Sequence, residues 1–131
     1  MRLRAVVRVQ WTLLAVCSDR GDCQLLEFLG DLDVGAGRES KHMLALMART
    51  AEHGPPIKED LCASLGDDIY EFRKSGLRVL FFYDAERTII CCNAYRKQSL
   101  KLGHGQKERA MAARAAYFAA KRAGRLEVIG S

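Results

Sequence analysis

Residues 66–97 read GDDIYEFRKSGLRVLFFYDAERTIICCNAYRK, and this stretch decides the fold. Apolar and aromatic residues dominate three runs, at about residues 69–74, 77–83 and 88–95, and turn-forming residues separate them. Short runs of this composition joined by tight turns predict antiparallel β-strands. The sequence therefore predicts a three-stranded meander.

The first turn of the meander sets two arginines against each other. If Ser75 and Gly76 form a two-residue hairpin turn, Arg73 pairs with Arg78 on one face of the sheet. Two like charges directly opposite on a sheet destabilise it by a few tenths to about 1 kcal/mol. An anion between the guanidinium groups relieves that repulsion, so a phosphate-bearing substrate is the first hypothesis.

The second turn decides what lies beside the arginines. If it centres on Ala85 and Glu86, Arg78 lies opposite Asn93. The other face of the meander is nearly all apolar and must pack on helices. The arginine face is apolar at one end and polar at the other, and it is expected to carry Ile69, Glu71, Arg73, Arg78, Leu80, Phe82, Ile89, Cys91, Asn93 and Tyr95.

Two interpretations of the polar end stay open. Guanidinium groups bind phosphate through paired hydrogen bonds and can stabilise a phosphorane-like transition state. A tyrosine such as Tyr95 can stack on a base or take part in proton transfer. The alternative is a solvated outer face on which the arginines pair with Glu71 and neighbouring acids, because most surface charges have no dedicated ligand.

The segments before the meander predict one strand and two helices. Residues 5–16 alternate apolar and polar side chains, which is typical of a strand. Residues 25–32 carry apolar side chains at helical spacing, and residues 40–53 do so behind Ser40, a plausible helix cap. The two glycines in residues 33–38 predict a loop between these helices.

The remaining segments complete an α+β fold. Gly-Pro-Pro at residues 54–56 stops the second helix, and residues 57–65 hold a short lead-in strand. The Ala-rich, basic residues 106–122 predict a C-terminal helix. The order β-α-α-β-β-β-β-α predicts a small antiparallel sheet with two N-terminal helices and one C-terminal helix. We expect one domain over residues 1–123 and a short tail over residues 124–131.

The composition is that of a soluble globular protein with a mild positive charge. The chain has 131 residues, 49% of them hydrophobic and 28% charged, and a net charge of +5. Residues 96–125 hold many basic residues against one acid, Glu108, so this end would attract a polyanion. The apolar run at residues 11–17 is too short to cross a bilayer, and we expect a cytoplasmic protein without membrane contact.

The cysteines and histidines predict no metal site and no cofactor. The five cysteines include no CxxC pair, and Cys91 and Cys92 point to opposite faces of a strand. We therefore expect reduced, buried thiols. The three histidines are scattered; His104, between two glycines, lies close in sequence to the basic cluster and could serve as an acid or base.

The meander resembles that of the RelE/HigB superfamily of bacterial toxins, and is closest to its phage-derived HigB-like branch. The resemblance is carried by IYEFR at residues 69–73, SGLRVLFFY at 75–83 and AYRK at 94–97, in that order and spacing. The opening strand, the two helices and the Gly-Pro break also fit. The resemblance covers about residues 5–121.

The resemblance implies a RelE-like fold and a type II toxin–antitoxin function. Such toxins cleave mRNA without a metal, typically on the ribosome, by attack of a ribose 2′-OH on the adjacent phosphate. It also implies a co-encoded antitoxin, in this branch usually a helix-turn-helix protein, and a toxin that is a monomer when free.

Carried over by position, Arg78 resembles the transition-state phosphate binder and Arg73 the arginine of the preceding strand. Tyr95 replaces the usual aromatic residue near the strand end, and Lys97 belongs to the basic pair that follows it. The resemblance thus implies the catalytic residues Arg78, Arg73, Tyr95 and Lys97, and the RNA-binding residues Arg96, Lys101, Asn93 and His104.

The sequence also departs from the family pattern. Gln98 replaces the second lysine of the basic pair, and Glu71 stands where some members carry a lysine. No tyrosine matches the C-terminal tyrosine or histidine that serves some members as a base, so the general base is not identified. These departures support an alternative function, a catalytically inactive RNA- or protein-binding member of the same fold. A third interpretation is a structural interaction protein with an apolar binding surface.

Overall fold

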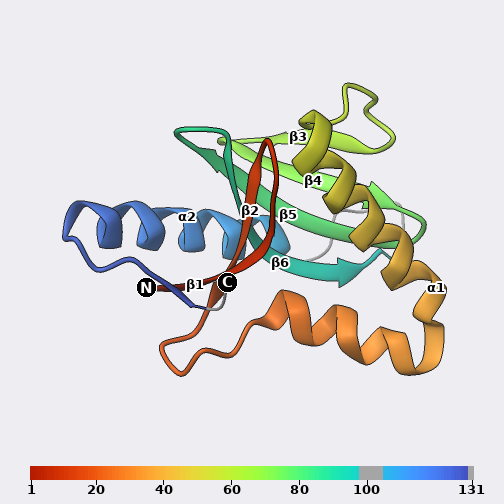
Figure 1. The fold of residues 1–131 in the computed structure, drawn as a ribbon, viewed down its shortest axis with the longest axis horizontal. Helices are drawn as coiled ribbons and strands as arrows, with labels where there is room; N and C mark the ends of the chain where they lie inside the picture. Colours follow the sequence, from red (N-terminus) through yellow and green to blue (C-terminus); the bar gives the residue numbers. More distant parts are fainter. Residues whose placement is uncertain (98–104, 130–131) are drawn as a thin grey trace.

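A computed structural model describes residues 1–97 and 105–129, with only the backbone at residues 31–36. Seven strands form one mixed sheet in the order β3-β4-β5-β6-β2-β1-β7, and helices α1 and α2 pack against it (Figure 1). The α+β class is confirmed. The sheet has more strands than the small antiparallel sheet that was predicted. It is also mixed, because β2 pairs with β6, and β1 with β7, in parallel.

The predicted meander forms the central part of the sheet. Its strands are β4 (Ile69–Lys74), β5 (Leu77–Asp84) and β6 (Thr88–Arg96), and the lead-in strand β3 (Cys62–Gly66) pairs with β4. These strands form because aromatic and β-branched residues alternate in short runs that turn residues interrupt. The hairpin pairing of Arg73 with Arg78 is confirmed.

The opening segment is a hairpin, so the prediction of one strand over residues 5–16 is wrong. Strands β1 (Arg2–Arg8) and β2 (Thr12–Cys17) pair antiparallel. The backbone N–H groups of Gln10 and Trp11 donate to the carbonyl of Ala51 on α1, at 2.9 and 2.8 Å. A tertiary contact therefore stabilises a turn that carries no local turn signal, and the alternating pattern runs through it unbroken.

The N-terminal helical segment is assigned as one helix, α1 (Gln24–His53), that bends sharply (Figure 1). The hydroxyl of Ser40 donates to the carbonyl of Leu29 at 2.7 Å. In a straight helix, residues eleven apart would be separated by roughly 16 Å. The two arms match the two expected helices, but the backbone at residues 33–38 is helical where a loop was predicted.

The C-terminal part adds a helix and a strand. Helix α2 (Gln106–Arg122) has the predicted bounds, and β7 (Glu127–Ile129), in the segment expected to be a tail, pairs with β1. Asp84 on β5 accepts a hydrogen bond from the Tyr117 hydroxyl at 2.5 Å and from Lys121 Nζ at 2.8 and 2.9 Å. These bonds anchor α2 to the end of the β5–β6 hairpin.

The sheet separates two apolar cores. The first lies between the sheet and α1 and includes Phe72, Val79 and Phe81. The second lies between the sheet and α2 and includes Leu80 and Phe82. The arginine face is therefore covered by α2, whose first residue Gln106 also contacts Asn93 at the polar end, and the side chains of Arg73 and Arg78 stay partly exposed.

The pairing of β5 with β6 differs from the predicted register at two points. The turn has three residues, 85–87, and a β-bulge lies between Leu80 and Phe81, so Arg78 lies opposite Tyr95 rather than Asn93. Each irregularity shifts the register by one residue, and a one-residue shift moves side chains to the other face. Ile89 and Cys91 consequently lie in the α1 core, so their predicted position on the arginine face is wrong.

The cysteines also depart from expectation. Cys17 at the end of β2 and Cys23 before α1 form a disulfide, whereas all thiols were expected to be reduced. Cys62, Cys91 and Cys92 are free and buried, and burial raises the pKa of Cys92 to about 12. In residues 1–97 and 105–129, no helix is long and apolar enough to cross a membrane.

Candidate functional site

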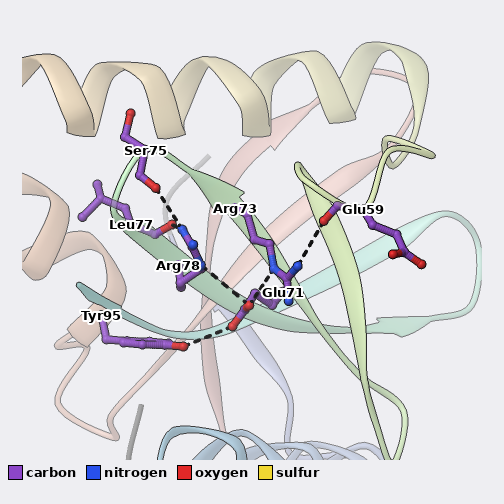
Figure 2. Close-up of polar contacts among 7 residues, drawn as sticks. All are labelled: Glu59, Glu71, Arg73, Ser75, Leu77, Arg78 and Tyr95. Carbon is purple, nitrogen blue, oxygen red and sulfur yellow. Dashed lines mark hydrogen bonds and ion pairs between the residues drawn. The ribbon is translucent and has the colours of Figure 1, made fainter. Parts of the chain in front are cut away.

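The candidate site is a charged cluster at the polar end of the α2-facing side of the sheet. Glu71 and Arg73 come from β4, Arg78 from β5 and Tyr95 from β6 (Figure 2). Residues two apart on a strand share a face, and the observed pairings of Arg73 with Arg78 and of Arg78 with Tyr95 place these four side chains together. Three neighbouring strands thus build the cluster.

The carboxylate of Glu71 is the centre of this cluster. Its Oε1 accepts a hydrogen bond from Arg73 Nε at 2.9 Å and lies 3.8 Å from Arg78 Nε. Its Oε2 accepts a hydrogen bond from the Tyr95 hydroxyl at 3.2 Å. The anion between the two arginines is therefore a side chain of the protein itself, as the alternative interpretation of the sequence proposed.

Backbone carbonyls hold the outer parts of the two guanidinium groups. Arg73 Nη1 donates to the carbonyl of Glu59 at 3.2 Å. Arg78 Nη1 donates to the carbonyls of Ser75 and Leu77 at 3.0 and 2.8 Å (Figure 2). The hairpin turn, in which Ser75 has a positive φ of 54°, therefore positions Arg78 as well as setting the register.

Exposure decides which members of the cluster a ligand can reach. The Glu71 side chain is 2% exposed, whereas those of Arg73 and Arg78 are 30% and 15% exposed. A guanidinium group has five N–H donors, and the bonds described above use Nε and Nη1 of Arg73 and Nη1 of Arg78. The arrangement offers two adjacent, pre-oriented cations with donors left for an external phosphate.

The chain matches a known protein family over the part that contains this cluster. A family model described as "Phage derived protein Gp49-like (DUF891)" matches residues 27–116, which is more than half of the chain. The chain belongs to this Gp49-like family. The family is associated with toxin–antitoxin toxins of the RelE/HigB type. No curated protein matches the chain.

The other predicted site residues of this Gp49-like protein are spread over both faces. Asn93 is buried beside the cluster, and its Nδ2 donates to the Gln106 side chain at 2.7 Å. Arg96 lies on the α1 side, where its Nη1 contacts Glu39 Oε2 at 2.7 Å. The backbone N–H of Lys97 donates to Gly76 O at 2.8 Å, which places Lys97 beside the hairpin turn. Lys101 and His104 lie outside the described residues.

Glu71 was predicted only as a possible partner of the arginines, without a functional role. Its spacing of two residues from Arg73 was the sequence signal for its place on the arginine face, and the structure adds that its carboxylate contacts both arginines and Tyr95. The carbonyl of Glu59, which binds Arg73, has no such signal, because a loop carbonyl contributes through backbone position alone. Among the described residues, no group of three or more His, Cys, Asp or Glu side chains could hold a metal ion.

Proposed function

We propose that this Gp49-like protein is the toxin of a type II toxin–antitoxin pair and cleaves ribosome-bound mRNA without a metal ion. Membership of a toxin-associated family supports the toxin part. The arginine pair carries the nuclease part: Arg73 and Arg78 are cross-strand neighbours, and both are held in place by Glu71 and by backbone carbonyls.

The proposed reaction is an internal transesterification of the RNA. The ribose 2′-oxygen forms a bond to the adjacent phosphorus, and the bond to the 5′-oxygen of the next nucleotide breaks. The 2′-OH loses a proton, and the leaving 5′-oxygen gains one. Two guanidinium groups beside the phosphate stabilise the additional charge of the pentacovalent transition state.

Glu71 and Tyr95 act in this proposal as positioning residues. Glu71 is too deeply buried to contact a phosphate, but it fixes both arginines, and Tyr95 fixes the other oxygen of its carboxylate. Lys97, at the exit of β6, would contact the RNA backbone. Lys101, Arg96 and His104 remain proposed RNA-binding residues, whereas Asn93, predicted with them, is as buried as Glu71 and would act only by holding Gln106.

Glu71 also favours a second candidate function, a catalytically inactive RNA- or protein-binding member of the family. Its carboxylate already neutralises part of the charge that a scissile phosphate would meet. In this case the cluster would stabilise the sheet, and the arginines would have no catalytic role.

Replacing Arg78 distinguishes the two functions. Under the proposal, Arg78→Ala lowers cleavage of ribosome-bound mRNA by roughly 100- to 1000-fold, the usual loss for one transition-state donor. Induced expression of the wild type arrests bacterial growth and fragments mRNA, and expression of the variant does not. The matched control is Arg8→Ala, which removes the same charge at the exposed end of β1.

Circular dichroism must show that both variants are folded. A folded wild type that leaves growth and mRNA intact would reject the nuclease proposal and favour the inactive binder. Equal cleavage by Arg78→Ala and wild type would reject the arginine site.

A further inference from the structure

A groove outside the Glu71 cluster lies between the second arm of α1, residues 38–53, and the segment 54–61 that follows it. Its cavity volume is about 570 Å³, within the range of ligand-binding pockets. The apolar residues that line it are Ala45, Leu46, Pro55, Pro56, Ile57 and Leu61. The groove is therefore an apolar surface that the described part of the fold leaves uncovered.

Ile57 is the most unusual residue of this groove. It is 98% exposed, more than any other large hydrophobic residue described. Two prolines precede it, and proline fixes the backbone φ angle, so this segment loses less conformational freedom on binding. A single exposed apolar residue is ordinary, but one that borders an apolar groove extends a contiguous binding patch.

The charged side chains that line the groove are all basic. Arg49 comes from α1, Lys58 from the segment after the prolines and Lys74 from the end of β4, and His42 and His53 also line the groove. The carboxylate of Glu52 contacts His53 Nε2 at 3.6 Å, but Glu52 is not among the lining residues. A partner that buries apolar side chains here would therefore be favoured by carboxylates at its edges.

The lining favours a protein segment over RNA. Proteins that bind single-stranded RNA place aromatic side chains where bases can stack, and these contacts supply much of the affinity. Among the described residues that line this groove there is no Phe, Tyr or Trp; the aromatic rings are the imidazoles of His42 and His53, and six apolar side chains make up much of the remaining lining. An apolar groove with a charged edge instead has the form that accepts one side of an amphipathic helix.

The groove is connected to the arginine site through the backbone. Glu59, whose carbonyl accepts the hydrogen bond from Arg73, directly follows the groove residue Lys58. Lys74, which lines the groove, directly follows Arg73 in β4. A partner seated in the groove would contact the segments that position Arg73.

We propose that this groove binds an acidic amphipathic helix of the antitoxin. The apolar side of the helix packs on Ile57 and Leu46, and its carboxylates pair with Arg49, Lys58 and Lys74. The identity of the partner as an antitoxin rests on the proposed function, whereas its chemistry follows from the groove.

The test uses the full chain and a synthetic peptide as the probe. The peptide is a dye-labelled helix of about sixteen residues, with leucines at helical spacing on one side and glutamates on the other. Fluorescence anisotropy should show that Ile57→Glu and Lys58→Glu each weaken its binding about tenfold or more, the effect of losing a central contact. Met111→Glu is the matched control, because Met111 is an exposed apolar residue (39%) on α2.

Equal binding of the peptide by all three variants, or no binding by the wild type, would overturn the proposal. It would also be overturned if a labelled single-stranded RNA, rather than the peptide, lost affinity in Ile57→Glu. Arg78→Ala separates this proposal from the nuclease function, since it should retain full peptide binding. If the wild type binds the peptide in this groove but does not cleave RNA, only the nuclease proposal fails.

Discussion

Replacing Glu71 by glutamine tests the central feature of the cluster. Glutamine has nearly the same shape and can still accept the hydrogen bond from Arg73 Nε, so the change removes charge with little loss of packing. Arg73 and Arg78 would then face each other across the hairpin without an anion between them. Glu71→Gln should therefore destabilise the fold.

The size of this effect follows from burial. Removing one partner of a fully buried ion pair costs about 3–5 kcal/mol. Here the carboxylate is buried, but Arg73 and Arg78 are 30% and 15% exposed, so water can screen part of the repulsion. We expect a loss of about 2–3 kcal/mol in the free energy of unfolding, or a fall in Tm of roughly 6–15 °C for a domain of this size.

Urea unfolding at pH 7, followed by circular dichroism, measures this loss. The matched control is Glu39→Gln, which removes the carboxylate that contacts Arg96 at 2.7 Å, where both side chains are about one-third exposed (33% and 32%). Exposed pairs contribute at most about 1 kcal/mol. A loss for Glu71→Gln no larger than that for Glu39→Gln would refute the inference that Glu71 holds the arginines together.

Inorganic phosphate offers a second measurement on the same variant. With the carboxylate removed, phosphate can bind between the two guanidinium groups and stabilise the folded state. At ten times its Kd, a bound ligand adds about 1.4 kcal/mol to the free energy of unfolding. Phosphate should therefore stabilise Glu71→Gln more than the wild type, and an equal response would contradict the inference that the Glu71 carboxylate occupies the position of an external anion.

Two further predictions concern stability. Burial alone would raise the pKa of Asp84, but hydrogen bonds from Lys121 and Tyr117 outweigh burial and hold the pKa below its usual value. The ionised Asp84 therefore stabilises the folded state above the pKa of the unfolded chain, about 3.9, and this stabilisation is lost as the pH falls below that value and through the lower pKa of the folded state. In urea unfolding, Asp84→Asn should be less stable than the wild type at pH 6, and the difference should shrink at pH 3; a constant difference would contradict this. Reducing the disulfide between Cys17 and Cys23 with dithiothreitol should cost the wild type about 2 kcal/mol, and the paired variant Cys17→Ala with Cys23→Ala should not respond. An unchanged wild type with a confirmed reduced disulfide would contradict this estimate.

Local patterns were sufficient for the parts of the fold that depend on neighbours in sequence. The meander, the pairing of Arg73 with Arg78 and helix α2 follow from turn residues and from side-chain periods of two and 3.6. The candidate site was predicted in part from the sequence. The arginines and Tyr95 lie together as predicted, because side chains two residues apart on a strand share a face.

Contacts between segments distant in sequence decided the features that local patterns did not predict. The β1–β2 turn depends on the carbonyl of Ala51, a contact that has no local signature. The glycines in residues 33–38 predicted a break between the two arms of α1, but not the hydrogen bond between Ser40 and Leu29 that joins the arms. The register of β5 and β6 depends on a three-residue turn and on a β-bulge, and burial of both faces of the sheet favours this register over its alternatives.

The sequence by itself determined that two arginines meet across a hairpin, and that this pair needs a compensating anion. Only the tertiary structure decided which anion is present, because the carboxylate of Glu71 must reach Arg73, Arg78 and Tyr95 on three strands at once. It likewise decided that Arg96 pairs with Glu39 on the other face, and that the groove beside Ile57 stays open. Charge and periodicity are local properties of a chain, whereas the burial and partners of a charged group depend on how distant segments pack.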